Sequence, residues 1–305
     1  MGKQLQIRVG TLALAVASLM GCSATNFLRT CPTTAKFSFT TINTTGDTFT
    51  QLLGVNNSGK IAGYHGSGAD PQHPNKGFTL VTPASFTDEN FPASAQTQVI
   101  GISMSGNTVG FYVDANGLTH GFSDVGGAFT TVDAPNTTFN QLLGLNDKGE
   151  AAGYSQDANG IQHPYTVQGT AFTPISTPGT SAQATGVNNN GDVSGFYVDA
   201  GGTTHGFLVP AGKTLITVDF PASTFTQVLG LNNLGDAVGT YTDAQGAIHG
   251  FIYNVASAKF ETIDDPSGAG NTVASGLNDK GTLVGFSVDK AGNTNGFKAV
   301  ITGCM

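Results

Sequence analysis

Histidine and aspartate recur together along this sequence, and both side chains can bind metal ions or transfer protons. Lys76 and Asn295 stand at the histidine position in the first and last copies of a repeat. The four recurrent histidines are His120, His163, His205 and His249. Equivalent imidazoles could form a shared metal ring. If the copies surround an axis, however, symmetry keeps these side chains apart. We therefore expect each histidine to hydrogen-bond within its own copy, for instance to the aspartate turn before it.

Two sets of aspartates recur at loop positions of the same repeat. The first set, in a turn before the histidine, is Asp114, Asp157, Asp199, Asp243 and Asp289. The second set, after the following strand, is Asp133, Asp219 and Asp264. Aspartate stabilises turns through hydrogen bonds to its own backbone, which explains both sets structurally. Because both loop types should lie on one face, that face should be acidic. A divalent cation or a basic partner there is a hypothesis, and no other cofactor is predicted.

The first copy departs from the repeat through a three-residue insertion between His65 and His73. Residues shared by all copies are explained by folding, whereas residues that break the pattern need another reason. The insertion places His65, Asp70 and His73 in one loop on the acidic face, and we predict these three as ligand-binding residues. The alternative is an insertion tolerated in a surface loop without function.

The spacing of the reactive residues does not indicate any known combination of catalytic residues. Glutamate occurs only at Glu89, Glu150 and Glu261, and no pair must meet within the about 5–10 Å that a glycosidase requires. No Ser-His-Asp set, Cys-His set or phosphate-binding glycine motif is present. We therefore assign no catalytic residue, and the sequence favours a protein that is not an enzyme.

A sixfold repeat must position all of these residues. Its anchor glycines are Gly54, Gly101, Gly144, Gly186, Gly230 and Gly276, which are 42 to 47 residues apart. A second glycine follows each anchor after nine residues in every copy: Gly63, Gly110, Gly153, Gly195, Gly239 and Gly285. An aromatic residue follows the second glycine after 12 residues in five copies and after 15 in the first. A period in the forties indicates a propeller or an array of repeats.

Each copy predicts four short strands joined by tight turns. Asn, Asp and Gly fill the turns, as in 146–149, because they adopt the positive φ that hairpins need. Proline ends the fourth strand at Pro135, Pro221 and Pro266, and no segment of the mature chain has helical periodicity. The predicted fold is all-β, a six-bladed β-propeller over residues 36–305. The last copy has only three strands, so the N-terminal strand at 37–43 should complete it and close the ring.

The N-terminal residues predict export. Residues 1–21 resemble a signal peptide, with Lys3 and Arg8 before an apolar stretch that is too short to span a membrane. The segment 19–22 resembles a bacterial lipoprotein cleavage site, with Cys22 as the acylated new N-terminus and 22–35 as a tether. Conventional cleavage is the alternative. Cys31 and Cys304 flank the first and last strands, so we predict a disulfide between them; two unpaired thiols are the alternative.

Composition excludes several classes of partner. The formal net charge is −8 and only 10% of residues are charged, which argues against nucleic acid and anionic membrane surfaces. Arg8 and Arg29 are the only arginines. The predicted folded domain therefore lacks the residue that most often binds carboxylate and phosphate groups. The absence of tryptophan weakens a lectin interpretation, although Tyr and Phe can also stack on sugars.

The repeat resembles the bacterial extracellular HAF repeat, named for a His-Ala-Phe signature. Here the signature reads His-Gly-Phe at His120, His205 and His249, after Gly-Leu-Asn-Asn or Gly-Val-Asn-Asn and a Val-Gly-Tyr-like segment. The resemblance covers about residues 46–302. Glycine replaces alanine throughout, and the third copy reads His-Pro-Tyr at 163–165. The resemblance implies a propeller-like surface protein and transfers no catalytic residue.

These observations predict a secreted or lipid-anchored bacterial cell-surface module that binds or scaffolds, with a glycan or protein of the envelope as partner. A monomer is expected, and contact with the membrane only through an N-terminal lipid. The alternative is an extracytoplasmic polysaccharide lyase or hydrolase with its site at the channel mouth. An enzyme should show non-repeating polar residues converging on the axis near the first copy's insertion. A scaffold should show a quasi-symmetric mouth of Gly, Asn and Thr.

Overall fold

The computed structural model describes residues 35–67, 72–82 and 85–304, and these form 24 strands and no helix. Below, repeat units 1 to 6 are numbered by their anchor glycines. Unit 1 contains β2 (Phe49–Val55), β3 (Lys60–Gly66), β4 (Lys76–Val81) and β5 (Ser85–Asp88). Unit 2 contains β6 (Gln96–Ile102), β7 (Thr108–Val113), β8 (Thr119–Val125) and β9 (Ala128–Thr131). Unit 3 contains β10 (Asn140–Leu145), β11 (Glu150–Gln156), β12 (Gln162–Gln168) and β13 (Ala171–Pro174).

The remaining units follow the same order of strands. Unit 4 contains β14 (Ser181–Val187), β15 (Val193–Val198), β16 (Thr204–Val209) and β17 (Ile216–Val218). Unit 5 contains β18 (Phe225–Leu231), β19 (Asp236–Thr242), β20 (Ile248–Asn254) and β21 (Lys259–Ile263). Unit 6 contains β22 (Thr272–Leu277), β23 (Thr282–Val288) and β24 (Thr294–Cys304), and β1 (Ala35–Thr41) pairs with β24.

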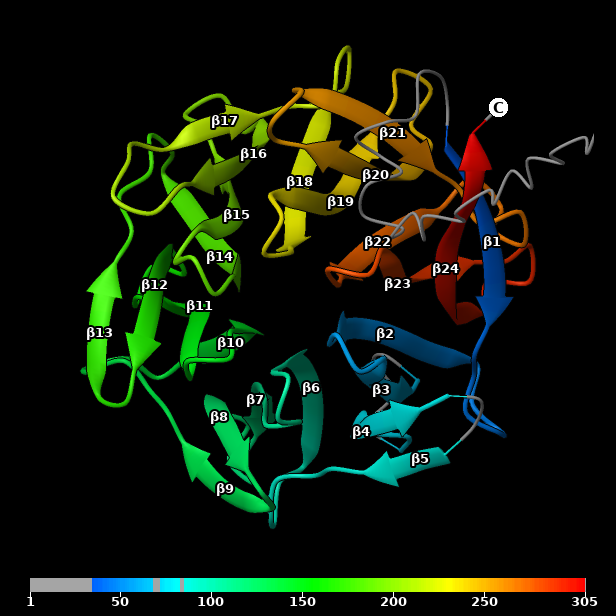
Figure 1. Ribbon diagram of the computed structural model, residues 1–305. Coiled ribbons are helices and arrows are strands. Elements are labelled where there is room, and N and C mark those ends of the chain that lie inside the picture. The colour runs from blue at the N-terminus through cyan, green and yellow to red at the C-terminus, as the bar shows by residue number, and fades with distance from the viewer. Residues whose placement is uncertain (1–34, 68–71, 83–84, 305) are drawn as a thin grey trace, which may run out of the picture.

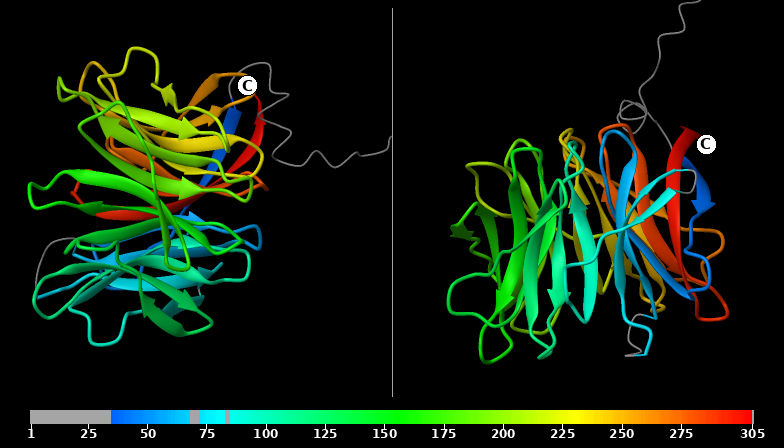
Figure 2. Two further views of the ribbon diagram at one scale, coloured as in Figure 1. Left: turned by 90° about the vertical axis from the view of Figure 1, so that its left-hand side faces the viewer. Right: turned by 90° about the horizontal axis from the view of Figure 1, so that it is seen from below.

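The sheets stand around a common centre, with the first strand of every unit innermost (Figure 1). Units 2 to 5 each form a separate antiparallel four-stranded sheet. Units 1 and 6 and β1 share an eight-stranded sheet, in which a parallel bridge between Phe49 and Thr294 joins β2 to β24. Seen from the side, the strands run between two faces that carry the loops (Figure 2). The all-β prediction and the absence of helix are confirmed for the described residues.

The N-terminal strand lies where the sequence predicts it. β1 runs antiparallel to β24, from the pair Ala35–Cys304 to the pair Thr41–Phe297. It begins one residue before the predicted domain start, because Ala35 already pairs. The predicted signal peptide, the lipidation site Cys22 and the disulfide partner Cys31 lie outside the described residues.

The anchor glycines let neighbouring inner strands approach backbone to backbone. A Cβ atom added to Gly144 would lie 2.6 Å from the Cα of Gly186 in the next unit. A Cβ atom at Gly276 in unit 6 would lie 2.5 Å from the carbonyl oxygen of Leu53 in unit 1. Real Cβ atoms cannot approach backbone so closely, so the anchor position requires glycine. The same requirement therefore applies between the last and first units.

The aromatic residue that ends the repeat forms the core of each sheet. Five copies are phenylalanines with no exposed surface: Phe78, Phe122, Phe207, Phe251 and Phe297. Each packs below the second glycine of its unit; the ring of Phe251, for example, lies 2.8 Å from the position of a Cβ atom at Gly239. In unit 3 the residue is Tyr165, whose hydroxyl is buried without a hydrogen-bond partner among the described residues.

We expect Tyr165→Phe to raise the free energy of unfolding by about 1–2 kcal/mol, because it removes a buried polar group that has lost its hydrogen bonds to water. Tyr197→Phe is the matched control, because the Tyr197 hydroxyl lies 3.1 Å from Oγ1 of Thr217; it should destabilise the protein by about 1 kcal/mol. Urea denaturation of both variants measures the difference. A Tyr165→Phe variant no more stable than the wild type would contradict the prediction.

Candidate functional site

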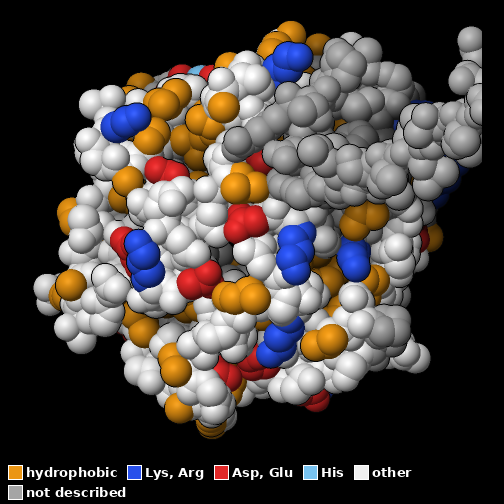
Figure 3. Space-filling model, in the orientation of Figure 1, with side chains coloured by type: hydrophobic (Ala, Val, Ile, Leu, Met, Phe, Trp, Pro, Cys, Tyr) orange, Lys and Arg blue, Asp and Glu red, His pale blue; other side chains and the backbone are white. Residues whose placement is uncertain are grey.

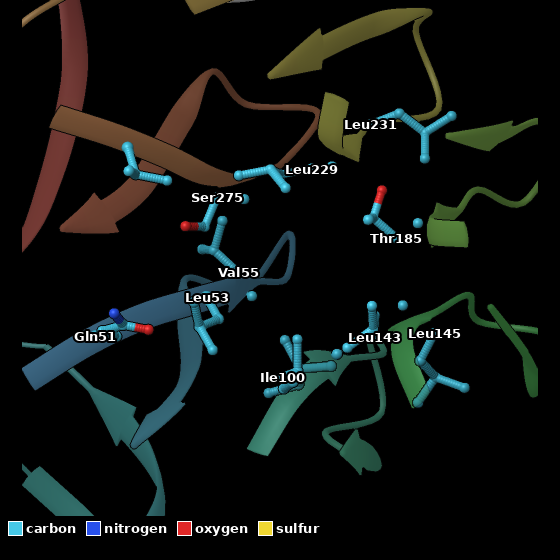
Figure 4. A pocket seen from close by; sticks show the side chains of 18 of the residues that line it. Gln51, Leu53, Val55, Ile100, Leu143, Leu145, Thr185, Leu229, Leu231 and Ser275 are labelled. Carbon is cyan, nitrogen blue, oxygen red and sulfur yellow. The ribbon is translucent and has the colours of Figure 1, made fainter. Parts of the chain in front are cut away.

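A cavity of about 560 Å³ lies on the central axis and is lined by the inner strands of all six units. Along each inner strand, side chains alternate between the sheet interior and the axis, as in any strand. Thr50 and Leu52 of β2 are fully buried in the sheet, whereas Gln51 and Leu53 are partly exposed and line the cavity. Figure 4 shows these axial side chains converging from several strands.

One end of the cavity carries a ring of glutamines, here called the glutamine collar. Its members stand three residues before the anchor glycines: Gln51, Gln98, Gln141, Gln183 and Gln227, with Val273 in the sixth position. The amide of Gln141 accepts a hydrogen bond of 3.0 Å from the Tyr154 hydroxyl. The other four glutamine amides make no hydrogen bond with another described residue. They are free to donate to and accept from a ligand.

An aromatic residue stands beside most collar positions on the second strand. The cross-strand pairs are Gln51–Tyr64, Gln98–Phe111, Gln141–Tyr154, Gln183–Phe196 and Val273–Phe286. Unit 5 differs, because Thr240 faces Gln227. Burial raises the pKa of Tyr64, so its hydroxyl stays protonated at neutral pH.

The middle of the channel is mostly apolar. Leu53, Ile100, Leu143 and Leu229 point toward the axis, together with the hydroxyl residues Thr185 and Ser275 (Figure 4). Thr185 donates a hydrogen bond of 2.8 Å to the carbonyl oxygen of Val228 in the next unit. Ser275 is 8% exposed, and its hydroxyl has no hydrogen-bond partner among the described residues.

The other end of the channel carries an asparagine collar. Its members are Asn56, Asn146, Asn188, Asn232 and Asn278, with Ser103 in unit 2. Each Asn side-chain oxygen accepts backbone N–H groups of its own turn, as Asn188 does from Asn190 and Asp192 at 2.9 Å. Each Asn side-chain nitrogen donates to a carbonyl oxygen of the next unit, and Asn278 of unit 6 donates to Asn56 of unit 1 at 2.9 Å. Ser103 is too short to reach unit 3, so the cycle has a single gap.

The described wall of the 560 Å³ cavity contains no Asp, Glu, His, Cys, Lys or Arg side chain that could activate its hydroxyl groups. All side chains that line the 560 Å³ cavity are aliphatic, aromatic, amide or hydroxyl. They can form hydrogen bonds and apolar contacts, and they recur from unit to unit. A scaffold is expected to have a quasi-symmetric mouth of Gly, Asn and Thr. One end of the cavity does carry a ring of asparagines. The other end carries glutamines instead, so the expectation is wrong there.

The recurrent histidines lie on the third strand of their units, separated from the innermost strand by the second strand, and each contacts at least one aspartate of its own unit. His205 Nδ1 is 2.8 Å from Asp219 and its Nε2 is 3.3 Å from Asp199. His120 and His249 have the same arrangement, whereas His163 contacts only Asp157, at 3.2 Å. The expectation of hydrogen bonds within each unit is therefore confirmed. Within the described ranges, no group of three His, Cys, Asp or Glu residues is arranged to hold a metal ion.

Hydrogen bonds and burial act in opposite directions on the pKa of His205. The bond to Asp219 has the largest effect and raises this pKa, burial comes next and lowers it, and the bond to Asp199 adds to the rise. The backbone N–H of Thr203 and the bond to His205 lower the pKa of Asp199. The clusters are thus explained by turn and strand geometry, and they do not converge on one site.

Two of the three residues predicted as ligand-binding in unit 1, His65 and His73, contact the same aspartate, Asp47. Asp47 Oδ2 is hydrogen-bonded to His65 Nδ1, and Asp47 Oδ1 lies 3.4 Å from His73 Nε2. Thr44 Oγ1 also donates to Asp47, at 3.2 Å. Asp47 belongs to the loop between β1 and β2 and was not predicted, while Asp70 lies outside the described residues. The two histidines therefore share one carboxylate, and neither of them lines the 560 Å³ cavity.

We expect the free energy of unfolding to depend on pH through the partly buried carboxyl group of Glu89. It accepts a hydrogen bond from Thr108 of unit 2. Burial raises its pKa, and Asp124 adds to the rise, while Thr108 and Lys60 oppose it. A carboxyl with a raised folded-state pKa contributes stability that is present below its unfolded pKa and is lost as the pH rises through the folded pKa.

We expect Glu89→Gln to be more stable than the wild type at pH 7. Between about pH 4 and pH 7 its stability should decrease less than that of the wild type. Glutamine keeps the oxygen that accepts from Thr108 and removes the buried charge. Melting temperatures measured across this range test the prediction. Parallel curves for the two proteins would show that Glu89 does not contribute in this way.

The sequence matches no protein-family model and no curated protein. Solved structures are nevertheless similar. A TolB-type protein from Agrobacterium tumefaciens has a TM-score of 0.60 at 10% identity, covering 88% of this chain and 99% of that chain. TolB from Acinetobacter baumannii has a TM-score of 0.55 at 11% identity, covering 81% of this chain and 65% of that chain. The Aleuria aurantia lectin has a TM-score of 0.53 at 12% identity, covering 90% and 99%.

At these identities the similarity concerns the fold alone. The chain also spans less than two thirds of the Acinetobacter protein. The comparisons and the arrangement of the sheets together establish an all-β fold of the β-propeller type.

Proposed function

We propose that this protein is an extracytoplasmic binding or scaffolding module without catalytic activity, built as a closed six-bladed β-propeller. The observation that carries the proposal is the neutral, repeating channel wall. A catalytic hydroxyl needs a base or a charged group beside it, and the described lining of the cavity contains no Asp, Glu, His, Cys, Lys or Arg.

Three observations support six blades. The six repeat units each supply an inner strand to the same cavity. The eight-stranded sheet divides into β2–β5 and β22–β24 with β1, and among the described strands a single ladder pair, Phe49–Thr294, joins the two groups. The asparagine collar also links unit 6 to unit 1. In this proposal β1 completes the last blade.

The cellular context is a proposal from the sequence. Export through residues 1–21, lipidation at Cys22 and a Cys31–Cys304 disulfide would place the propeller in the bacterial envelope or outside the cell. The backbone of Cys304 pairs with that of Ala35, which follows Cys31 by four residues in the sequence. The part of the chain that the structure describes contains no helix able to cross a bilayer.

A glycan or a protein of the envelope is the proposed partner. One similar structure is a lectin in complex with Fucα1-6GlcNAc, and others are TolB proteins. Figure 3 shows charges of both signs scattered over the face in view, without a continuous basic patch. This distribution and the net charge of −8 give no support to a nucleic-acid partner.

Incubation of the purified mature protein with envelope polysaccharides and envelope proteins tests the proposal. We expect a partner to raise the melting temperature without any cleavage product appearing, because binding to the folded state alone stabilises it. Release of shortened or unsaturated sugars, lost when the His65–His73 loop is altered, would favour the lyase or hydrolase alternative instead.

A further inference from the structure

The end of the channel at the glutamine collar combines free amides with aromatic rings. Four collar amides, those of Gln51, Gln98, Gln183 and Gln227, make no hydrogen bond with another described residue, although all four are partly buried. A partly buried amide has lost some of its hydrogen bonds to water, so a ligand that supplies hydrogen bonds in their place binds favourably. A cavity of about 560 Å³ is within the usual range for small-ligand sites, roughly 300–1,000 Å³.

The wall excludes charged ligands. No Lys, Arg, His, Asp or Glu lines the described cavity, so an ionised group entering it would lose water without gaining a partner of opposite charge. A side-chain amide presents both donors and an acceptor, and a sugar hydroxyl also does both. Amides and hydroxyls therefore match each other in either orientation.

The ring arrangement favours a sugar over an extended peptide. Collar amides approach the axis from five of the six units, so a ligand on the axis meets polar groups on almost every side. A pyranose ring carries hydroxyls around its whole edge, whereas an extended peptide presents its hydrogen-bonding groups along two opposite edges.

Unit 6 lacks the collar glutamine and offers an apolar surface to the cavity instead. In unit 6 the collar position is Val273, and its cross-strand partner Phe286 is partly exposed in the cavity. Unit 5, which adjoins unit 6, contributes Gln227 and Thr240 to the same cavity. An apolar ring beside a polar edge matches a pyranose, which has C–H groups on its faces and hydroxyls around its rim.

We propose that the glutamine collar binds neutral hexopyranose units of a glycan, through hydroxyl contacts with Gln227 and Gln98 and through packing of a sugar face on Phe286. This inference rests on the proposed binding function and names its ligand class. Binding of an envelope protein in place of a neutral glycan is a separate outcome of the test.

A neutral-glycan array, followed by titration calorimetry with cellotetraose, maltotetraose and chitotetraose, tests the proposal on the mature protein. We expect saturable binding of at least one neutral glycan by the wild type. Gln227→Ala and Phe286→Ala should each weaken that binding at least fivefold. The matched control is Gln245→Ala, an exposed glutamine in the turn after β19, which should bind as the wild type does. Melting curves establish that all three variants fold.

Failure of every neutral glycan to bind the folded wild type would overturn the inference, and so would equal weakening by Gln245→Ala. The proposed function has a separate outcome. If a purified envelope protein binds the wild type but not Gln227→Ala, while neutral glycans bind neither, the binding module stands and the glycan assignment is wrong.

Discussion

Gly239→Ala should destabilise the protein by about 3 kcal/mol or more, and the variant should melt roughly 6–12 °C below the wild type or fail to fold. An added Cβ atom would lie 1.9 Å from the carbonyl oxygen of Gln227 and 2.8 Å from the ring of Phe251. The carbonyl belongs to the paired strand β18, where the register shifts between Val228 and Gly230. Relief of the clash therefore requires movement of the ladder or of a fully buried phenylalanine.

Gly201→Ala is the matched control for that variant. Gly201 lies in an exposed turn, and the nearest atom to an added Cβ is a flexible Asp199 carboxylate oxygen at 3.2 Å. This substitution should change the free energy of unfolding by less than about 0.5 kcal/mol. Thermal and urea denaturation measure both changes. A Gly239→Ala protein as stable as Gly201→Ala would mean that close packing does not explain why the second glycine recurs in every unit.

Asn188→Leu should cost about 3 kcal/mol, because one buried side chain serves four hydrogen bonds. Its oxygen accepts from the backbone of Asn190 and Asp192 at 2.9 Å, and its nitrogen donates to Asp192 at 2.8 Å and to the carbonyl oxygen of Asn232 at 3.1 Å. Asn188 is 3% exposed, so water cannot replace the lost partners. Urea denaturation of the variant measures the loss.

The gap in the asparagine collar provides the reverse experiment. Ser103→Asn supplies the missing amide toward unit 3, and we expect it to add about 1 kcal/mol to the free energy of unfolding. Ser103 is 5% exposed, so the new side chain must fit the collar as its five counterparts do. If Asn188→Leu were neutral and Ser103→Asn destabilising, the collar would not hold neighbouring units together.

Local spacing predicted most of the fold. The nine-residue interval between anchor and second glycine reflects a hairpin whose two strands pair in every unit, as β18 and β19 do. Turn residues and the ending prolines marked the strand ends to within a few residues. The fourth strand before Pro135, for instance, is β9 at Ala128–Thr131. It ends before Asp133, whose side chain accepts from the backbone N–H of Gly121 and is hydrogen-bonded to His120.

The glutamine collar was visible in the sequence but was not recognised. Glutamine stands three residues before the anchor glycine in five of six units, and strand alternation places it on the face opposite the buried Leu52 or Val99. Spacing alone does not show the role of these amides, because that role depends on the lack of a hydrogen-bond partner within the folded protein.

Other contacts could not be predicted from local pattern. Asp47 meets His65 and His73 only because the loop after β1 passes beside the insertion of unit 1. The partner of Glu89 depends in the same way on how two units pack, since Thr108 belongs to the next sheet. Neither contact is encoded by spacing within one repeat.

The binding channel is tested most directly by the NMR spectrum of glutamine side-chain amides in the mature protein during titration with the neutral glycan selected by the array. Substitution of Gln227, Gln98 and Gln245 by alanine assigns their signals. We expect saturable shifts for Gln227 and Gln98 and none for Gln245, with the glycan recovered intact. Unshifted Gln227 and Gln98 signals, shifts of equal size for Gln245, or cleavage of the glycan during the titration would contradict a binding channel.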